Sequence, residues 1–333
     1  MSLGFDCGTY NLVTARRGDT PEEVKVKREV NAFLKIPLED RFTFNMLKKS
    51  GVKLYEQKKI AYVLGEGAVK MAYTFGKDLA RPMKDGTLNP EESESFEILK
   101  VMIHSLVGEI KGPKETVYYC VPADAVNAAT NAAYHKKIIE QIFLAYNVNG
   151  KKIEAFSINE ALALIYAELA DRFYTGVGIS FGSGMVNACV SVFSQSAAQF
   201  SIVGSGDWID SQVAKVTNTP AVVVNQEKMK FDLLAPQTSP LERALNASYR
   251  ILVENTVDQI KSALTKANLK VKVEDPFNIV LGGGVASPNG FEDLVREAIK
   301  NADFPIPVGE IIKPKDHLYA VARGCLCAAE QAN

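Results

Sequence analysis

The feature that most constrains the fold is a short glycine hairpin that occurs twice in the chain. GFDCGTYNLVTA (residues 4–15) and GISFGSGMVNAC (residues 178–189) align without a gap. Each consists of a β-rich run, a tight glycine turn and a second β-rich run, which is typical of a β-hairpin. The second copy begins about half-way along the 333 residues, which predicts a duplication into two similar lobes; the alternative is a chance likeness between unrelated hairpins. The coinciding residues include Gly4/Gly178, Asp6/Ser180, Gly8/Gly182 and Thr9/Ser183.

Strand-like and helix-like segments alternate around the two hairpins, which predicts an α/β sheet in each lobe. Asn89 followed by Pro90 is a typical helix start, and Asn159 is a suitable N-cap for the helix that follows it. Buried strands are predicted at 114–122, 153–158 and 277–281, and helices at 89–107, 123–146, 159–172 and within 208–265. Lobe I is predicted at 1–152 and 313–333, with a small insertion at about 31–80, and lobe II at 153–312.

Composition places the chain among ordinary globular proteins and removes several function classes. Hydrophobic residues make up 47% and charged residues 23%, so a full core can be buried. The net charge of −1 gives no bulk attraction to polyanions, so we expect no direct nucleic-acid partner, and a membrane only through a partner or a local patch. The five cysteines and three histidines are scattered, which argues against a zinc site. No apolar run of about 18 residues and no leader is present, so a cytoplasmic location is expected.

The turn of each hairpin has the composition of a phosphate-binding loop. Glycine leaves room for a phosphate against the backbone and lets several backbone N–H groups point into one concavity. In the first hairpin, Asp6 is a candidate ligand for hydrated Mg²⁺, and the Thr9 hydroxyl can bind a phosphate oxygen. Two such turns that face each other would hold a polyphosphate from both sides.

A third glycine cluster lies in IVLGGGVAS (residues 279–287), between a predicted strand and a helix-like segment. Gly282, Gly283 and Gly284 expose backbone there, so that a flat ring or a phosphate can approach a helix N-terminus. The simpler interpretation is an ordinary strand-to-helix turn. The chain has neither GxxxxGK[ST] nor a GxGxxG after its first strand, which argues against P-loop and Rossmann nucleotide sites.

In this order the motifs resemble those of the actin-like ATPase superfamily, and most closely those of bacterial actins of the MreB and MamK type. FDCGTYNLV resembles the first phosphate motif, GISFGSGMV the second, and IVLGGGVAS the adenosine motif, while RPMKDG (81–86) is similar to a segment typical of MreB. INEALALIYAEL (158–169) and YAVARGCLCA (319–328) resemble the two connecting helices. The resemblance spans nearly the whole chain. It implies the duplicated, ribonuclease-H-like α/β fold of actin, with a nucleotide cleft between two lobes.

The resemblance also implies a site for ATP or ADP with Mg²⁺. Glu160 falls where the family has a Glu or Gln that orients the attacking water, and Asp6 falls at the metal position. Glu227 and Lys230 match a pair that contacts the nucleoside, although from the residues alone they read as an ordinary exposed pair. The other nucleotide-binding positions implied by the family are Gly8, Thr9, Tyr10, Asn11, Gly182, Ser183, Gly184, Met185, Gly206, Asp207, Gly282, Gly283 and Gly284.

One departure from the family pattern bears on activity. Ser180 stands where the family carries an Asp that helps to hold the hydrated magnesium and the attacking water. Serine keeps a hydroxyl and lacks the charge, so we expect ATP binding with slow hydrolysis. The implied function is a cytoplasmic actin-like protein that self-associates into nucleotide-dependent filaments with a cytoskeletal or positioning role. The alternatives are a non-polymerising, nucleotide-switched chaperone or reactivating factor of the same fold, and a small-molecule kinase.

Overall fold

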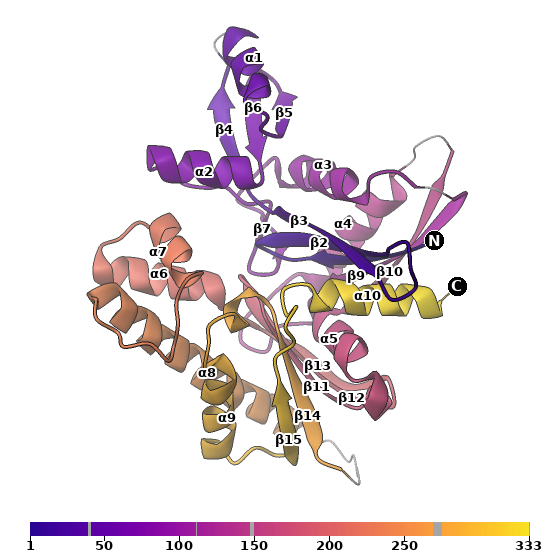
Figure 1. Ribbon diagram of the computed structural model, residues 1–333, viewed down its shortest axis with the longest axis vertical. Coiled ribbons are helices and arrows are strands. Elements are labelled where there is room, and N and C mark those ends of the chain that lie inside the picture. The colour runs from indigo at the N-terminus through magenta and orange to yellow at the C-terminus, as the bar shows by residue number, and fades with distance from the viewer. Residues whose placement is uncertain (39–40, 111, 147–149, 269–274, 333) are drawn as a thin grey trace.

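Two five-stranded sheets with the same strand order form the centres of two lobes (Figure 1). The computed structural model describes residues 1–38, 41–110, 112–146, 150–268 and 275–332. The first sheet has the order β10-β9-β1-β2-β3 and the second β15-β14-β11-β12-β13. Their strands are β1 (Ser2–Cys7), β2 (Asn11–Arg17), β3 (Val24–Val30), β9 (Lys114–Val121), β10 (Lys152–Asn159), β11 (Gly176–Phe181), β12 (Met185–Val192), β13 (Gln195–Val203), β14 (Phe277–Gly282) and β15 (Val308–Ile312).

The two sheets repeat each other down to the register of their hairpins. In both sheets, the three strands that come first along the chain pair antiparallel to one another. The two strands that come last along the chain are added in parallel pairings beside the first strand. Gly4 pairs with Ala15 in the first hairpin, and the equivalent Gly178 pairs with Cys189 in the second. The turns match as well, because the amide-to-carbonyl hydrogen bonds Gly8 N to Asn11 O and Gly182 N to Met185 O both measure 3.0 Å. The predicted duplicated α/β fold is therefore confirmed.

Two helices pack between the sheets and join the lobes. Helix α5 (Glu160–Glu168) contacts β11, and α10 (Ala320–Gln331) contacts both β1 and α5 (Figure 1). Both contacts need a glycine in the strand. A Cβ at Gly4 would lie 2.1 Å from the Ala322 carbonyl oxygen, and a Cβ at Gly178 would lie 2.1 Å from the Ala161 carbonyl oxygen. Asn159 caps α5 as predicted, since its side chain accepts hydrogen bonds from the next helical amides. These are the two connecting helices that the sequence predicted.

Alternation along the hairpin strands sends apolar side chains to the cores and polar ones to the space between the lobes. Phe5 lies in the lobe I core, where its ring meets that of Phe143 edge-on at 5.2 Å. Phe181 meets Phe291 in the same way at 5.0 Å in the lobe II core. Such aromatic pairs add about 1 kcal/mol each to the burial of their surface. The cores thereby fix the hairpin strands that carry the site.

Smaller elements extend each lobe (Figure 1). A three-stranded sheet of β4, β6 and β5 lies within the predicted insertion at 31–80, beside α1 and α2. No helix in the described residues has the length and apolar character that crossing a membrane requires. The remaining elements are β4 (Phe33–Pro37), α1 (Arg41–Lys49), β5 (Leu54–Gln57), β6 (Ile60–Leu64), α2 (Glu66–Phe75), β7 (Met83–Lys84), β8 (Thr87–Leu88), α3 (Ser95–Val107), α4 (Ala132–Leu144), α6 (Gly206–Thr217), α7 (Ala221–Lys228), α8 (Pro240–Ala267), α9 (Phe291–Asn301) and the 3₁₀ turns η1 (Ala170–Arg172) and η2 (Gly284–Ala286).

Two predicted helices start later than the sequence suggested. The helix expected from residue 123 is α4, which begins at Ala132. The residues before it hydrogen-bond across to β13, where Val126 N donates to Ser201 O, and Ser201 N donates to Asp124 O. The helix expected from residue 89 is α3, which begins at Ser95. Asn89 caps a local turn instead, because its side chain accepts from Glu91 N.

The predicted lobe boundary at 152/153 falls at the start of β10. Strand β10 is hydrogen-bonded along its whole length to β9 in the first sheet. We therefore propose that lobe I extends to the end of β10 and that lobe II begins with α5.

Candidate functional site

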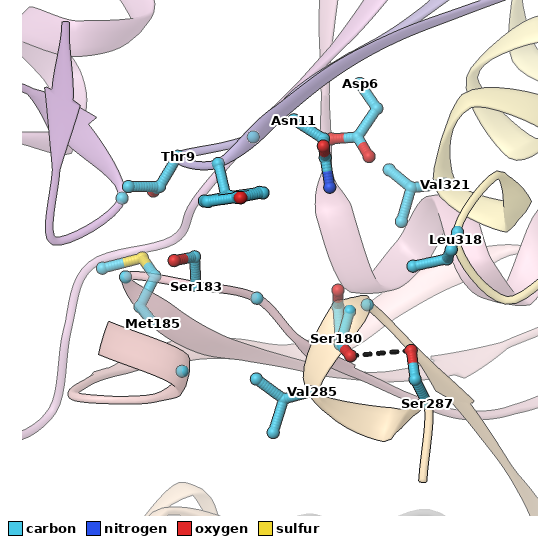
Figure 2. Close-up of a pocket in the computed structure, with 18 of the residues that line it drawn as sticks. Asp6, Thr9, Asn11, Ser180, Ser183, Met185, Val285, Ser287, Leu318 and Val321 are labelled. Atoms are coloured by element: carbon cyan, nitrogen blue, oxygen red, sulfur yellow. Dashed lines mark hydrogen bonds between the residues drawn. The ribbon is translucent and has the colours of Figure 1, made fainter. Parts of the chain in front are cut away.

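A cavity of about 350 Å³ lies between the lobes. The two hairpin turns face each other across it, with Asp6, Thr9 and Asn11 on one side and Ser180 and Ser183 on the other (Figure 2). Leu318, just before α10, and Val321, in its first turn, close the side that Val285 and Ser287 approach from lobe II (Figure 2). The cavity therefore has a polar end at the hairpins and a more apolar end at the third glycine cluster.

Most of the predicted site residues line this cavity, and a few do not. Asp207, Glu227, Lys230 and Gly282 are not among its lining residues. The lining residues that the sequence predicted are Asp6, Gly8, Thr9, Tyr10, Asn11, Glu160, Ser180, Gly182, Ser183, Gly184, Met185, Gly206, Gly283 and Gly284. The lining residues that it missed include Cys120, Asn225, Lys228, Met229, Tyr249, Ser287, His317 and Leu318.

Two partly buried carboxylates lie at the hairpin end of the cavity. Asp6 accepts a hydrogen bond from the Cys120 thiol at 3.1 Å. Glu160, at the first turn of α5, accepts from Ser180 Oγ at 2.6 Å and from Asn187 Nδ2 at 2.8 Å. Asn187 is fully buried, and its amide oxygen accepts in turn from Ser201 Oγ at 2.5 Å. Both oxygens of Glu160 are thus held by the second hairpin, and Ser180 is one of the two donors.

Burial raises the pKa of both carboxylates. The hydrogen bond from Cys120 opposes the effect on the pKa of Asp6. The negative charge of Asp6 raises the pKa of Glu160 further, and the hydrogen bond from Ser180 opposes it. A pair of carboxylates in this state favours a bound proton or cation. Mg²⁺ prefers one or two carboxylates together with water and phosphate oxygens, so this donor set fits the ion.

The raised pKa of Glu160 predicts how the metal-free protein responds to pH. The folded state holds protons that the unfolded state has already released, so the free energy of unfolding should fall as the pH rises from about 5 to about 8. In Glu160→Gln this fall should be smaller by about 1 kcal/mol or more. Urea unfolding in EDTA at a series of pH values measures both. An identical pH profile for the two proteins would show that Glu160 carries no raised pKa.

The predicted nucleoside pair lies at the C-terminal end of α7, on either side of a buried lysine. Glu227 and Lys230 form an exposed ion pair with 3.4 Å between Oε1 and Nζ. Lys228 is buried instead, 2.7 Å from Asp210 Oδ1, and donates to the Gly206 carbonyl at 2.8 Å. Residues 225, 226, 228 and 229 line the cavity, whereas the Glu227 side chain is exposed. Glu227 and Lys230 do not line the cavity, and their contact with the nucleoside stays a prediction.

The three glycines after β14 have three different surroundings. A Cβ at Gly282 would lie 2.6 Å from the Leu164 side chain. Gly283 has a φ of +85°, and a Cβ there would lie 2.3 Å from the Phe181 carbonyl oxygen, so a side chain would disturb the backbone before it met a ligand. Gly284 has open space, since the nearest atom to its Cβ position is Leu318 Cδ2 at 3.8 Å. Gly284 is thus the position where a side chain tests the cavity itself.

Two lobes of one duplicated topology, with a cavity between paired glycine hairpins, define an actin-like fold. A MamK double helical filament structure has this fold, with a TM-score of 0.67 and 16% identity over 99% of this chain and 98% of that one. A non-polymerising MamK mutant bound to AMPPNP gives a TM-score of 0.57 and 18% identity over the same shares. The chain belongs to the Volactin family, whose model matches residues 1–329. A search of curated protein sequences finds no match.

Proposed function

We propose that this protein binds ATP or ADP with Mg²⁺ in the cavity between its lobes. The observation that carries the proposal is the pair of equivalent hairpin turns, which face each other across the cavity with their glycine backbones and hydroxyl residues. Such paired turns present N–H groups and hydroxyls to a polyphosphate from two sides. The AMPPNP-bound MamK mutant, which shares the fold, supports a nucleotide as the ligand.

The cavity suggests which end of the nucleotide lies where. The phosphates would meet the turns at Thr9 and Ser183, beside the two carboxylates. The nucleoside would extend toward Gly284 and Leu318, where the lining includes apolar side chains and the open backbone of Gly284. Adenine recognition by this apolar end is consistent with pockets that combine apolar walls with a few polar groups.

Asp6 and Glu160 would hold the magnesium ion, directly or through its water. When bound, the ion neutralises phosphate charge as it develops in phosphoryl transfer. Glu160 reaches the same end of the cavity and would accept a proton from the attacking water, while Ser180 and Asn187 keep its carboxylate in one orientation. Because Ser180 contributes a neutral donor to this group, we propose that hydrolysis is slow and that nucleotide-bound states are long-lived.

We further propose that the protein assembles head to tail into filaments in the cytoplasm. A heterologous contact that does not close into a ring gives a filament, and the MamK filament shows that this fold supports one. Pelleting and negative-stain electron microscopy at about 10 µM, with MgATP, with ADP and without nucleotide, test this. ATP-dependent filaments are expected. A monomer in every condition would favour the chaperone-like alternative.

A side chain at Gly284 is expected to block the nucleoside end of the cavity. Gly284→Leu should weaken MgATP binding about 100-fold, or about 2.7 kcal/mol, because the new side chain occupies space that the ligand needs. Its melting temperature should stay close to that of the wild type, since no packed atom lies within 3.8 Å of the new Cβ. Isothermal titration calorimetry measures the affinity.

The matched control is Gly112→Leu, at a loop position outside the cavity where a Cβ meets only ordinary contacts. It should bind MgATP like the wild type. Equal affinities for Gly284→Leu and Gly112→Leu would place the nucleoside elsewhere.

A further inference from the structure

The segment that contains RPMKDG reaches from lobe I across to the second hairpin. Arg81 Nη1 lies 2.7 Å from Asp207 Oδ1, at the first turn of α6, and 3.2 Å from Ser183 Oγ. Its guanidinium also lies over the Tyr10 ring in the first hairpin turn, 5.2 Å from the ring centroid. One side chain of lobe I therefore touches both hairpin turns and the start of a lobe II helix.

The backbones are in contact at the same place. A Cβ at Gly184 would lie 2.6 Å from Gly86 N and 2.9 Å from Thr9 Oγ1, so the tip of the second hairpin rests directly on lobe I. Met185 packs against Gly86 from the other side, because a Cβ at Gly86 would lie 2.3 Å from its sulfur. The two lobes thus touch here without room for further side chains. They cannot separate at this place unless the Arg81–Asp207 ion pair breaks.

Ser183 connects this contact to the cavity. Its hydroxyl donates to Asp207 Oδ1 at 2.5 Å, the same oxygen that Arg81 contacts. Ser183 lines the cavity, whereas Arg81 and Asp207 lie behind it. Although burial raises the pKa of Asp207, the Arg81 charge and the Ser183 hydrogen bond keep this pKa below its ordinary value, so the pair is ionised. A phosphate oxygen beside Ser183 would compete with Asp207 for one O–H donor.

We propose that Arg81 and Asp207 are positioning residues that latch the two lobes together behind the second hairpin, and that a bound phosphate engages this latch through the Ser183 hydroxyl. The latch rests on the proposed function, because it acts on a nucleotide held between the lobes. Its consequence is slow nucleotide release. With the ion pair broken, the lobes part more often and the nucleotide leaves faster, although neither side chain lines the cavity.

Stopped-flow dissociation of a fluorescent ATP analogue tests the latch. Arg81→Met and Asp207→Asn should each raise the nucleotide dissociation rate about 10-fold. The double variant should be no faster than either single variant, because each single substitution already breaks the same Arg81–Asp207 ion pair. Lys84→Met is the control, since Lys84 lies in the same segment and pairs with Glu91 at 2.8 Å within lobe I. It should leave the rate unchanged. Additive effects, or melting temperatures that fall while the dissociation rate stays constant, would overturn the proposal.

Hydrogen exchange without nucleotide separates failure of the latch from failure of the nucleotide site. Amides of residues 182–185 should exchange faster in Arg81→Met than in the wild type or in Lys84→Met, because the hairpin tip loses its anchor. A wild type that binds no nucleotide but shows this difference would contradict the proposed function and keep the latch. Equal exchange in all three proteins would overturn the latch.

Discussion

Glu160→Gln is expected to lower the rate of ATP hydrolysis about 100-fold or more. The glutamine fills the same space and keeps a partner for Ser180 and Asn187, but it cannot accept a proton from water. The raised pKa of Glu160 brings this carboxylate toward the pH at which a general base works best. Release of labelled phosphate under single-turnover conditions, with protein in excess over ATP, measures the rate of the chemical step.

Glu154→Gln provides the control for this substitution. Glu154 lies in β10, and its half-exposed carboxylate pairs with Lys114 away from the cavity. It should hydrolyse ATP like the wild type. In Glu160→Gln, the MgATP affinity should change less than the rate of hydrolysis, since the hairpin turns are unaltered. An unchanged rate in Glu160→Gln would remove this residue from the reaction.

Ser180→Asp is expected to have opposite effects on stability and on hydrolysis. Ser180 is fully buried and touches Glu160, so a third carboxylate there faces two others in the metal-free protein. An unpaired buried charge costs about 3 kcal/mol, so the free energy of unfolding in EDTA should fall by about that amount. With MgATP bound, the new charge can hold the hydrated ion. Hydrolysis should then rise about 100-fold, the usual effect of one positioned group in such a site.

Ser180→Asn separates charge from size. It has nearly the volume of Asp and no charge, so it should leave hydrolysis slow. Single-turnover assays of the three proteins, together with urea unfolding with and without MgATP, give both quantities. Fast hydrolysis by the wild type, abolished by Glu160→Gln and not increased by Ser180→Asp, would show that Glu160 alone suffices and that the serine does not limit the reaction.

The repeated hairpin made most of the fold predictable. The turn geometry depends on residues three apart, such as Gly8 with Asn11 and Gly182 with Met185, so the local sequence determines it. The duplication then places both turns at equivalent edges of equivalent sheets. Both turns line one cavity in the structure, as expected for two loops that hold one polyphosphate from two sides.

The contacts that the sequence did not predict join segments far apart in the chain. Arg81 meets Asp207 from the other lobe, and nothing local to either residue indicates this partner. Residues 123–131 have a helix-like composition, yet hydrogen bonds to β13 keep part of this segment extended. A different cause applies to Lys228. Its neighbours Glu227 and Lys230 were chosen by their match to a family pattern, and that pattern gave no indication that Lys228 lines the cavity.

A nucleotide held between the two hairpins is expected to accompany assembly of an actin-like filament. Cryo-electron microscopy of the protein incubated with MgATP tests this most directly. We expect filaments in which each subunit carries nucleotide density, with phosphates between Thr9 and Ser183 and the base near Gly284. Filaments with an empty cavity, or protein that stays monomeric with nucleotide bound elsewhere, would contradict it.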